Sequence, residues 1–371
     1  MALTLDIVVY CLRKTIFSPY LAIFIPIALH FCSISSRLLL FVSCFWGVAI
    51  CFIQLLLYAD WRYANQARWF RAPPKLRWED QVVLITGGGS GIGALLAETL
   101  ADRSVAVAIL TKELPKQPFT HSHIHVFECD VSDYNAVMGM SARVREAVGD
   151  PTIIINNAGI VNGKLLLDLT EEDITSTFGS NTLAHFWVLK TFLPAMLRQG
   201  RGHIVTMSSI LGIVGAAQMT DYCASKAAVL SLHQTLRFEL DSRYQRPGIR
   251  TTLVLPAYTL TSLFNRVKLP TNRLFDFLCP PVQPRAVVEH IISALDDNES
   301  RIIRLPFYSN FARFCGDAVG LVPAGARDFV QWLSGADHAM KGYGPTPDAG
   351  ERLLAGSLAH RSTTEKEQNS L

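Results

Sequence analysis

A tyrosine and a lysine four residues apart, Tyr222 and Lys226, are the first pair of side chains that could do chemistry. They fall in a stretch with helical periodicity, and residues at positions i and i+4 lie on the same face of a helix. A tyrosine normally loses its proton near about pH 10. A neighbouring ammonium favours the phenolate, so Lys226 would lower the pKa of Tyr222 and make it a usable acid/base. An ordinary exposed pair on a helix would have the same spacing.

Two polar residues upstream could complete such a site. Ser209 lies thirteen residues before Tyr222, directly after the apolar run at 203–208. There its hydroxyl could hydrogen-bond a substrate oxygen and stabilise the charge that develops on it. Asn181 lies in another helical stretch, where it is either a polar residue inside a helix or a further member of the site.

A glycine-rich segment, Thr86–Gly93, follows the apolar run VVLI and precedes a helical pattern. Glycines let a backbone turn sharply and approach a pyrophosphate, which the N-terminus of the next helix stabilises. Such loops also make plain turns, but the strand–loop–helix context favours nucleotide binding. The residues of this loop expected to contact a cofactor are Gly87, Ser90, Gly91, Ile92 and Gly93.

Other candidate cofactor residues follow later strands. Asn157, in the run Asn156–Gly159, could close the cofactor site, since amide side chains can tie neighbouring strands together. Asp130 follows the run HVFEC and could accept a hydrogen bond from an adenine amino group. Its alternative role is to cap the helix that begins near Tyr134.

The end of the second predicted strand bears on which nicotinamide cofactor is used. An acidic residue at that place would bind a ribose 2′-hydroxyl and favour NAD. Here the position is apolar, and Lys112 could instead meet a 2′-phosphate. Glu113 could still reach the ribose. The pattern favours NADP, with NAD as the alternative.

Short β-rich runs alternate with helical segments from residue 81 onward. This alternation predicts an α/β fold, a doubly wound, Rossmann-like parallel sheet in a single catalytic domain over residues 81–343. The runs expected to be strands are VVLIT, VAVAIL, HIHVFEC, TIIIN, HIVTMS and TTLVLP. Helices are expected at 94–103 and 224–244. A polar, turn-rich segment at 344–371 is expected to be a disordered tail.

The first sixty residues carry most of the excess hydrophobicity and are interpreted as a membrane anchor, with apolar segments at 15–36 and 38–59. The second segment is long enough to span the roughly 30 Å hydrocarbon core as a helix. A cleaved signal peptide does not fit the length, the second apolar block or the absence of a small-residue cleavage site. A basic and aromatic linker follows at 61–80.

Basic residues flank the anchor on both sides, whereas the link between its two segments holds only Arg37. By the positive-inside rule both flanks stay cytosolic, which favours a hairpin in membrane lipid over a single span. The single span remains the alternative. The basic residues on the two flanks are Arg13, Lys14, Arg62, Arg68, Arg71, Lys75 and Arg77.

Composition argues against several other classes of protein. The net charge of +3 is small and dispersed, so no nucleic-acid surface is expected. Eight cysteines occur with no CxxC pair, and neither a disulfide framework nor a metal site is expected. The alternating His121, His123 and His125 are interpreted as a surface strand, since no fourth ligand lies nearby.

Taken together, these motifs resemble those of the classical short-chain dehydrogenases/reductases over about residues 81–300. The resemblance implies roles for Tyr222 as acid/base, Lys226 as pKa-lowering and ribose-binding residue, Ser209 as oxyanion stabiliser and Asn181 as proton-relay support. It also implies that Thr259 and Thr261 lie on the nicotinamide side. Many members have glycine where this chain has Ala257, so that loop is expected to sit differently.

A narrower likeness is to the branch that contains membrane-bound retinol dehydrogenases and lipid-droplet 17-beta-hydroxysteroid dehydrogenases. It is carried by the segments NNAGIVNGKLLLD, AHFWVLKTFLPAML, DYCASK and LSGADHAM. The resemblance implies hydride transfer between NADP(H) or NAD(H) and a lipophilic alcohol or carbonyl of retinoid, steroid or long-chain type. It further implies a location at the endoplasmic reticulum or lipid droplets, and a homodimer remains open.

Two other functions compete with this one. The first is an epimerase or dehydratase on the same fold, and the second is a non-catalytic membrane or lipid-droplet scaffold. The complete Asn/Ser/Tyr/Lys set argues against both. The apolar segment at 307–332 is either a second membrane contact or a cover over the substrate cleft.

Overall fold

The computed structural model describes residues 4–31, 36–65, 73–265, 267, 273–312, 322–334 and 336–340. The expected disordered tail at 344–371 lies outside the described residues. The same is true of part of the basic linker, including Arg68 and Arg71.

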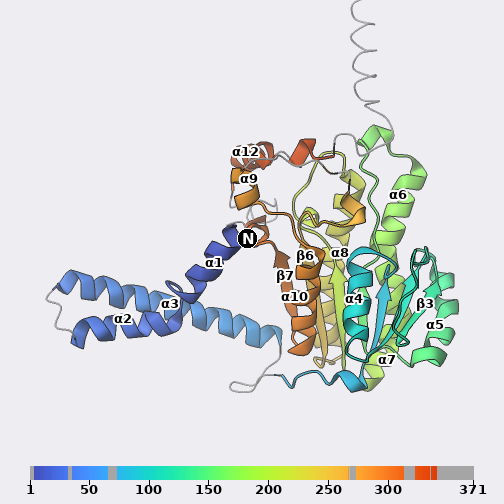
Figure 1. Cartoon of the computed structure of the whole chain (residues 1–371), viewed down its shortest axis with the longest axis horizontal. Helices are drawn as coiled ribbons and strands as arrows, with labels where there is room; N and C mark the ends of the chain where they lie inside the picture. Colours follow the sequence, from blue (N-terminus) through green and yellow to red (C-terminus); the bar gives the residue numbers. More distant parts are fainter. Residues whose placement is uncertain are drawn as a thin grey trace, which may run out of the picture.

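Seven parallel strands form the centre of the molecule, in the order β3-β2-β1-β4-β5-β6-β7 (Figure 1). The chain builds outward from β1 to β3, then crosses back and continues from β4 on the other side. This confirms the predicted doubly wound α/β fold and puts its switch point between β1 and β4. The strands are β1 (Val82–Thr86), β2 (Ala106–Thr111), β3 (Ile124–Glu128), β4 (Ile153–Asn156), β5 (Gly202–Met207), β6 (Ile249–Pro256) and β7 (Arg301–Leu305).

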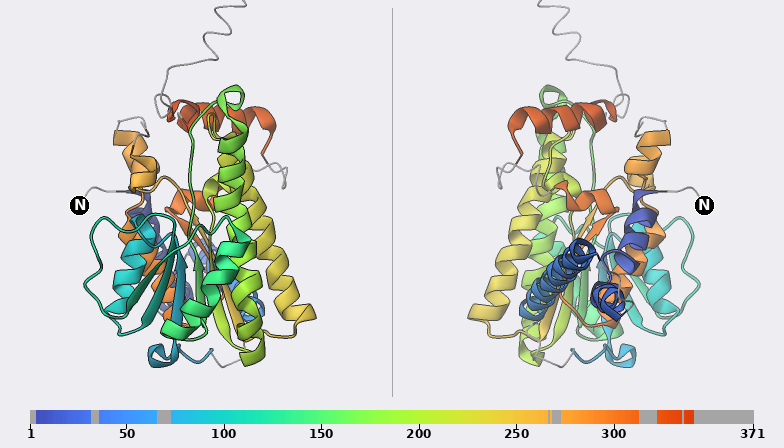
Figure 2. Two further views of the ribbon diagram at one scale, coloured as in Figure 1. Left: turned by 90° about the vertical axis from the view of Figure 1, so that its right-hand side faces the viewer. Right: turned by 90° about the vertical axis from the view of Figure 1, so that its left-hand side faces the viewer.

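Helices cover both faces of the sheet, because successive side chains of a strand point to opposite faces (Figure 2). Val83 and Ile85 of β1 pack in one hydrophobic cluster with α4 and α10, whereas Leu84 packs in a second cluster with α5, α7 and α8. These helices are α4 (Gly91–Ala101), α5 (Tyr134–Val148), α7 (Ala184–Gln199), α8 (Thr220–Phe238) and α10 (Pro284–Asp296).

The edge strand β7 is the strand that the sequence pattern missed. Its sequence, RIIRL, has an arginine at position 301 and another at position 304, which interrupt the apolar pattern expected of a buried strand. It pairs with β6 on one side, and its Ile302 is exposed. The other six strands coincide with the predicted runs to within about two residues.

Three helices precede the sheet: α1 (Leu5–Lys14), α2 (Pro19–Phe31) and α3 (Arg37–Ala64). Among the described residues, α3 is the one helix long and apolar enough to cross a membrane unaided, with a mean hydropathy of 2.3 over its most apolar window. Helices α1 and α2 pass the same test only as a pair, bent by 50°. Figure 1 shows α2 and α3 side by side, projecting away from the sheet.

Small residues allow α2 and α3 to approach closely. Gly47 of α3 faces Ala22 of α2, and a Cβ atom placed on Gly47 would lie 2.5 Å from Ala22 O. Ser43 and Ile50 flank Gly47 on the same buried face of α3. Small residues at a contact let two helix backbones pack closely. Such packing stabilises helix pairs in lipid, where the hydrophobic effect does not drive helices together.

The end of α3 is joined to the sheet through a buried asparagine. Asn65 Oδ1 accepts a hydrogen bond of 2.6 Å from Ser300 N, just before β7. The last carbonyls of the helix also have cationic partners, because Arg237 donates to Ala64 O and Arg250 donates to Asn65 O at 2.6 Å. Positive charge at a helix C-terminus is favourable, so this end of α3 is held to the part of the chain that contains the sheet.

Candidate active site

The glycine-rich loop takes the shape that a pyrophosphate requires. Gly87 and Gly91 have φ values of +65° and +57°, a region that other residues rarely adopt. A Cβ atom on Gly93 would lie 2.5 Å from Gly87 O and 2.6 Å from Asn157 Nδ2. Helix α4 begins at Gly91, and the first N–H groups of a helix have no partner within it. The loop therefore fits an anionic diphosphate at the start of α4.

Asn157 braces this loop from the neighbouring strand. Its Nδ2 donates to Thr86 O and to Gly87 O, both at 3.1 Å. The Thr86 hydroxyl oxygen accepts from the backbone N–H groups of Asn157 and Ala158, both at 3.0 Å. Asn157 was predicted to contact the cofactor, and its Nδ2 is bonded to the loop that would hold the cofactor.

Two residues predicted for the adenosine side lie together at the ends of β2 and β3. Lys112 Nζ is 2.8 Å from Asp130 Oδ2. The hydrogen bond and the charge of Asp130 raise the pKa of Lys112. Burial acts to raise the pKa of Asp130, but hydrogen bonds from Lys112 and Ser132 outweigh it and lower that pKa. The alternative of Asp130 as a helix cap is wrong, because Asp133 caps α5.

Asn181 lies in a π-helical turn, η3 (Gly179–Leu183), between α6 (Glu171–Phe178) and α7. Its Oδ1 accepts from Ile160 N at 2.7 Å, and its Nδ2 donates to Ile160 O and Ser225 Oγ, both at 3.0 Å. The wide turn therefore holds the buried amide between the segment after β4 and helix α8. The π turn was not predicted from the sequence.

Lys226 is buried beside Tyr222. Its Nζ donates to Met207 O at 3.1 Å and lies 5.7 Å from the centre of the Tyr222 ring. Burial lowers the pKa of Lys226 to about 8. A Cβ atom on Gly159 would lie 3.5 Å from Lys226 Nζ and 3.2 Å from Asn181 Oδ1. The side chains of Lys226 and Asn181 therefore both lie close to the backbone at Gly159.

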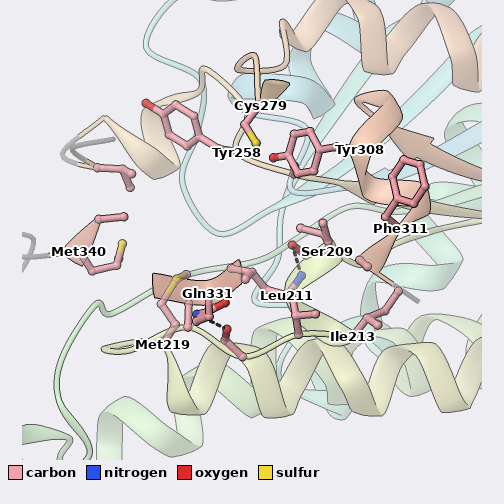
Figure 3. A pocket seen from close by; sticks show the side chains of 18 of the residues that line it. Ser209, Leu211, Ile213, Met219, Tyr258, Cys279, Tyr308, Phe311, Gln331 and Met340 are labelled. Atoms are coloured by element: carbon pink, nitrogen blue, oxygen red, sulfur yellow. Dashed lines mark hydrogen bonds between the residues drawn. The ribbon is translucent and has the colours of Figure 1, made fainter. Parts of the chain in front are cut away.

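Ser209 lines a large cavity, and Tyr222 packs against one of the residues that line it. The Ser209 hydroxyl accepts from Leu211 N at 3.1 Å and donates to Pro256 O at 3.3 Å, and its side chain lines the cavity (Figure 3). Tyr222 packs edge-on against Phe264, which lines the cavity too, with ring centres 6.1 Å apart. The four predicted catalytic residues thus gather at the carboxyl ends of β4, β5 and β6.

The cavity has a volume of about 550 Å³ and a mostly apolar lining. Its walls come from the segment after β5, from α9 (Arg273–Leu278) and from η7 (Phe307–Asn310). Helix α12 (Ala324–Ser334) covers it, because Gln331 Nε2 donates to Gly215 O at 3.0 Å. The described part of 307–332 therefore forms a cover over the cleft. Side chains that line it include Leu211, Ile213, Met219, Tyr258, Tyr308, Phe311 and Met340 (Figure 3).

Two threonines follow β6 on the expected nicotinamide side. Thr259 is buried and its hydroxyl donates to Ala257 O at 2.9 Å. Thr261 lies across from the glycine loop, since a Cβ atom on Gly91 would be 3.9 Å from Thr261 Cβ. Thr261 is thus placed at the cofactor groove, whereas the hydroxyl of Thr259 is bonded within its own loop.

The family described as short chain dehydrogenase matches residues 81–271, which is more than half of the chain. The chain belongs to the short-chain dehydrogenase family. Retinol dehydrogenase 10-B of Danio rerio is 35% identical over 62% of this chain and 75% of its own length. Retinol dehydrogenase 10 of Homo sapiens is 34% identical over 74% and 88%. These relatives put the chain in the retinol dehydrogenase branch of the short-chain dehydrogenases.

Solved dehydrogenase structures share the fold at lower identity. 4-Hydroxyisoleucine dehydrogenase complexed with NADH superposes with a TM-score of 0.53 at 21% identity, over 61% of this chain and 96% of that one. As a short-chain dehydrogenase, the chain is an NAD(P)-dependent enzyme that acts on alcohols. The non-catalytic scaffold is accordingly set aside.

A substitution in the glycine loop tests the cofactor groove. Gly93→Ala should weaken NAD(P)H binding at least about tenfold, because the added methyl group meets the backbone of Gly87 and the side chain of Asn157. The measurement is a titration of nucleotide fluorescence. Gly139→Ala is the matched control, since nothing lies within 4 Å of its Cβ position on α5. Equal affinity in the two variants would contradict the assignment.

Proposed function

We propose that this protein is a membrane-bound dehydrogenase that transfers a hydride between NADP(H) and a lipophilic alcohol or carbonyl of retinoid type. One observation carries the proposal: an apolar cavity of about 550 Å³ has Ser209 on its wall and Tyr222 packed against its lining. Pockets of about 300–1,000 Å³ accommodate ligands of this size class. Relatives named retinol dehydrogenases support the retinoid class over steroids or long-chain alcohols.

Each of the four predicted catalytic residues has one task in this reaction. When bound, the nicotinamide supplies or accepts the hydride. Tyr222 exchanges the proton of the substrate hydroxyl, and the Lys226 ammonium favours its phenolate form. Ser209 holds the substrate oxygen by a hydrogen bond. Asn181 fixes the backbone at Ile160 next to Lys226.

The cavity wall is suited to an apolar substrate. Burial raises the pKa of Tyr308, and the neighbouring Cys279 and Asp6 act in the same direction, so this phenol stays neutral. Phe264, Phe275 and Phe311 supply flat apolar surface around the cavity. A ligand with one hydroxyl and a long hydrocarbon body would place the hydroxyl at Ser209 and the body against these rings.

Replacement of the catalytic tyrosine tests this mechanism. Tyr222→Phe keeps the ring against Phe264 but removes the hydroxyl, so turnover of all-trans-retinol or retinal should fall at least about 10²-fold. Cofactor affinity should remain within about twofold of the wild type. Tyr244→Phe, at the exposed residue that follows η5 (Glu239–Arg243), controls for the loss of a phenol elsewhere. Near-normal turnover in Tyr222→Phe would refute the mechanism.

The preference for NADP over NAD rests on Lys112. Its side chain is 77% exposed at the end of β2, so its ammonium is accessible to a 2′-phosphate while it pairs with Asp130. Thr111, the last residue of β2, is not acidic, so no carboxylate lies directly at the end of the strand to bind a ribose 2′-hydroxyl. Lys112 is therefore assigned the role of cofactor discrimination.

Removal of this charge should separate the two cofactors. Lys112→Ala should weaken NADPH by about tenfold and leave NADH within about twofold, because only NADPH has the extra phosphate. Dissociation constants for both nucleotides are measured on the same preparation. Lys116→Ala removes a nearby exposed charge and serves as the control. Tighter binding of NADH than NADPH by the wild type would contradict the preference.

The N-terminal helices are proposed to form a hairpin in the membrane. At about 1.5 Å per residue, α3 with its 28 residues is about 42 Å long, whereas α2 with 13 residues is about 20 Å. Both ends of the hairpin touch the catalytic part: Asp6 of α1 accepts from Phe307 N at 2.7 Å, and Asn65 bonds Ser300. A single span would put these two ends on opposite sides, so the contacts support a hairpin. The basic residues on both flanks support a cytosolic catalytic part.

Membrane topology distinguishes the two arrangements. The full chain with a tag at each end should resist extraction by carbonate, and protease added to intact microsomes or lipid droplets should remove both tags. This follows because both flanks of the hairpin are cytosolic. A protected N-terminal tag would instead indicate a single span. Extraction of the chain into the soluble fraction would contradict membrane insertion altogether.

A homodimer is the proposed assembly. Helices α7 and α8 carry apolar side chains on their outer surface, and Phe186 and Phe238 are 44% and 66% exposed. Exposed apolar groups on neighbouring helices are typical of surfaces that bury against a partner. A second copy of the chain would cover them.

A further inference from the structure

A buried carboxylate joins the first turn of α8 to helix α6 and to the segment after β4. Asp221, the second residue of α8, is 4% exposed. Its Oδ2 accepts hydrogen bonds from Asn162 Nδ2 at 2.9 Å and from Thr177 Oγ1 at 2.8 Å. Asn162 Nδ2 also lies 2.9 Å from Thr177 Oγ1, so all three side chains contact one another. These three residues are called the Asp221 network below.

The network lies beside the proposed acid/base. Tyr222 follows Asp221 directly in the chain. Val161, in the segment after β4, packs against the hydrophobic cluster that contains Tyr222. Three residues after Tyr222 in the helix, Ser225 Oγ accepts a hydrogen bond of 3.0 Å from Asn181 Nδ2. The turn of α8 that carries the tyrosine is therefore held by side-chain hydrogen bonds both before and after it.

The Asp221 carboxylate has no cationic partner among the described residues. Its Oδ2 is bonded to two neutral donors, and its Oδ1 is buried without a hydrogen-bond partner there. Both hydrogen bonds come from other segments, so the side chain does not cap α8, although a helix N-terminus favours negative charge. A charge that is neither paired nor in contact with water acts strongly on its neighbours, because the local dielectric constant is low.

The charge of Asp221 acts on the turn that contains Tyr222. Burial raises the pKa of the Cys223 thiol, and the charge of Asp221 acts in the same direction. Tyr222 lies between these two residues in the chain, and a nearby negative charge likewise favours a neutral phenol. Lys226, whose Nζ is 5.7 Å from the centre of the Tyr222 ring, has the opposite effect. Tyr222 therefore lies between an anion and a cation on one helix.

Other titratable groups around this turn do not neutralise the carboxylate. Lys164, in the segment after β4, is paired with Asp173 of α6 at 2.6 Å. The hydrogen bond from Lys164 lowers the pKa of Asp173, so this pair is ionised and neutral overall. Burial lowers the pKa of His185 on α7 to about 3, so its ring is neutral. In η8 (Ala336–His338), Asp337 is half-buried and His338 is exposed, so water screens their charges.

We propose that Asp221 is a positioning residue that acts through Tyr222: its network fixes the first turn of α8, and its carboxylate opposes Lys226 by favouring the protonated phenol. The protonated phenol is the form that gives a proton to a carbonyl oxygen, so Asp221 keeps the site ready for reduction at neutral pH. Asp221 is not among the described residues that line the cavity. The proposal rests on the proposed role of Tyr222 as acid/base.

The test follows the ionisation of Tyr222 in the full-length protein saturated with NAD(P)⁺, in detergent micelles. The tyrosinate absorbance is titrated against pH, and subtraction of the Tyr222→Phe signal isolates this one residue. Asp221→Asn keeps the shape of the side chain and an oxygen that can accept from Asn162 and Thr177, but it removes the charge. It should lower the midpoint by about one pH unit, because Lys226 is then unopposed.

Glu171→Gln is the matched control. Glu171 is the first residue of α6 and is exposed, so water screens its charge and its loss should leave the Tyr222 midpoint unchanged. Thermal unfolding of each variant reports whether it is folded. If Asp221→Asn does not fold, Asp221→Ser removes the same charge and keeps a hydroxyl that can accept a hydrogen bond, and it should lower the midpoint in the same way.

The pH dependence of reduction gives a second measurement. Reduction requires the protonated phenol, so the rate of retinal reduction should fall as the pH rises through the Tyr222 midpoint. In Asp221→Asn this fall should begin about one pH unit lower than in the wild type. A residue with only a structural role would change the rate by the same factor at every pH and leave the position of the profile unchanged.

Three results would overturn the inference. The first is a Tyr222 midpoint in Asp221→Asn that stays at the wild-type value or rises. The second is a midpoint that falls as far in Glu171→Gln as in Asp221→Asn. The third is a pH profile of reduction that keeps its position in Asp221→Asn. The titration uses no substrate, so its failure is separate from failure of the proposed function, which normal turnover by Tyr222→Phe would reveal.

Discussion

Four hydrogen bonds join the first strand of the sheet to the segment after the fourth. Thr86 accepts from Asn157 N and Ala158 N, and Asn157 Nδ2 donates to Thr86 O and Gly87 O. These bonds close the switch point of the sheet, where the strand order reverses. The glycine loop sits on one side of this joint, and Gly159, which approaches Lys226 and Asn181, follows on the other. The glycine loop and the four predicted catalytic residues therefore share one structural base.

Residues defined by a local motif could be predicted from the sequence, and the reason is that their chemistry depends on near neighbours. Strand β1 begins and ends where the pattern VVLIT does, and the glycine loop follows it directly. The spacing of Tyr222 and Lys226 is set by one turn of a single helix. Short-range backbone geometry thus accounts for the glycine loop and for the spacing of the proposed acid/base pair.

Features that depend on contacts between distant segments could not be predicted in the same way. A π turn such as the one at Asn181 has no recognisable sequence periodicity. Strand β7 pairs with β6 although its two arginines interrupt the apolar pattern expected of a strand. The pairing of Lys112 with Asp130 joins the ends of two strands. The two asparagines of one motif also differ, because successive side chains of a strand point to opposite faces. Asn157 Nδ2 donates to Thr86 O and Gly87 O, whereas both amide atoms of Asn156 are buried without a hydrogen-bond partner among the described residues.

The joint at Asn65 has a consequence for how the enzyme would meet its substrate. Ser300, Arg237 and Arg250 hold the end of α3, and Phe307 holds α1, so the catalytic part is fixed to the helices at two points. In the proposed hairpin arrangement, tumbling about the lipid plane is lost and only lateral diffusion remains. Encounter then becomes two-dimensional, and the rate follows the mole fraction of substrate in the lipid rather than its bulk concentration. Addition of inert lipid would slow such an enzyme by surface dilution alone.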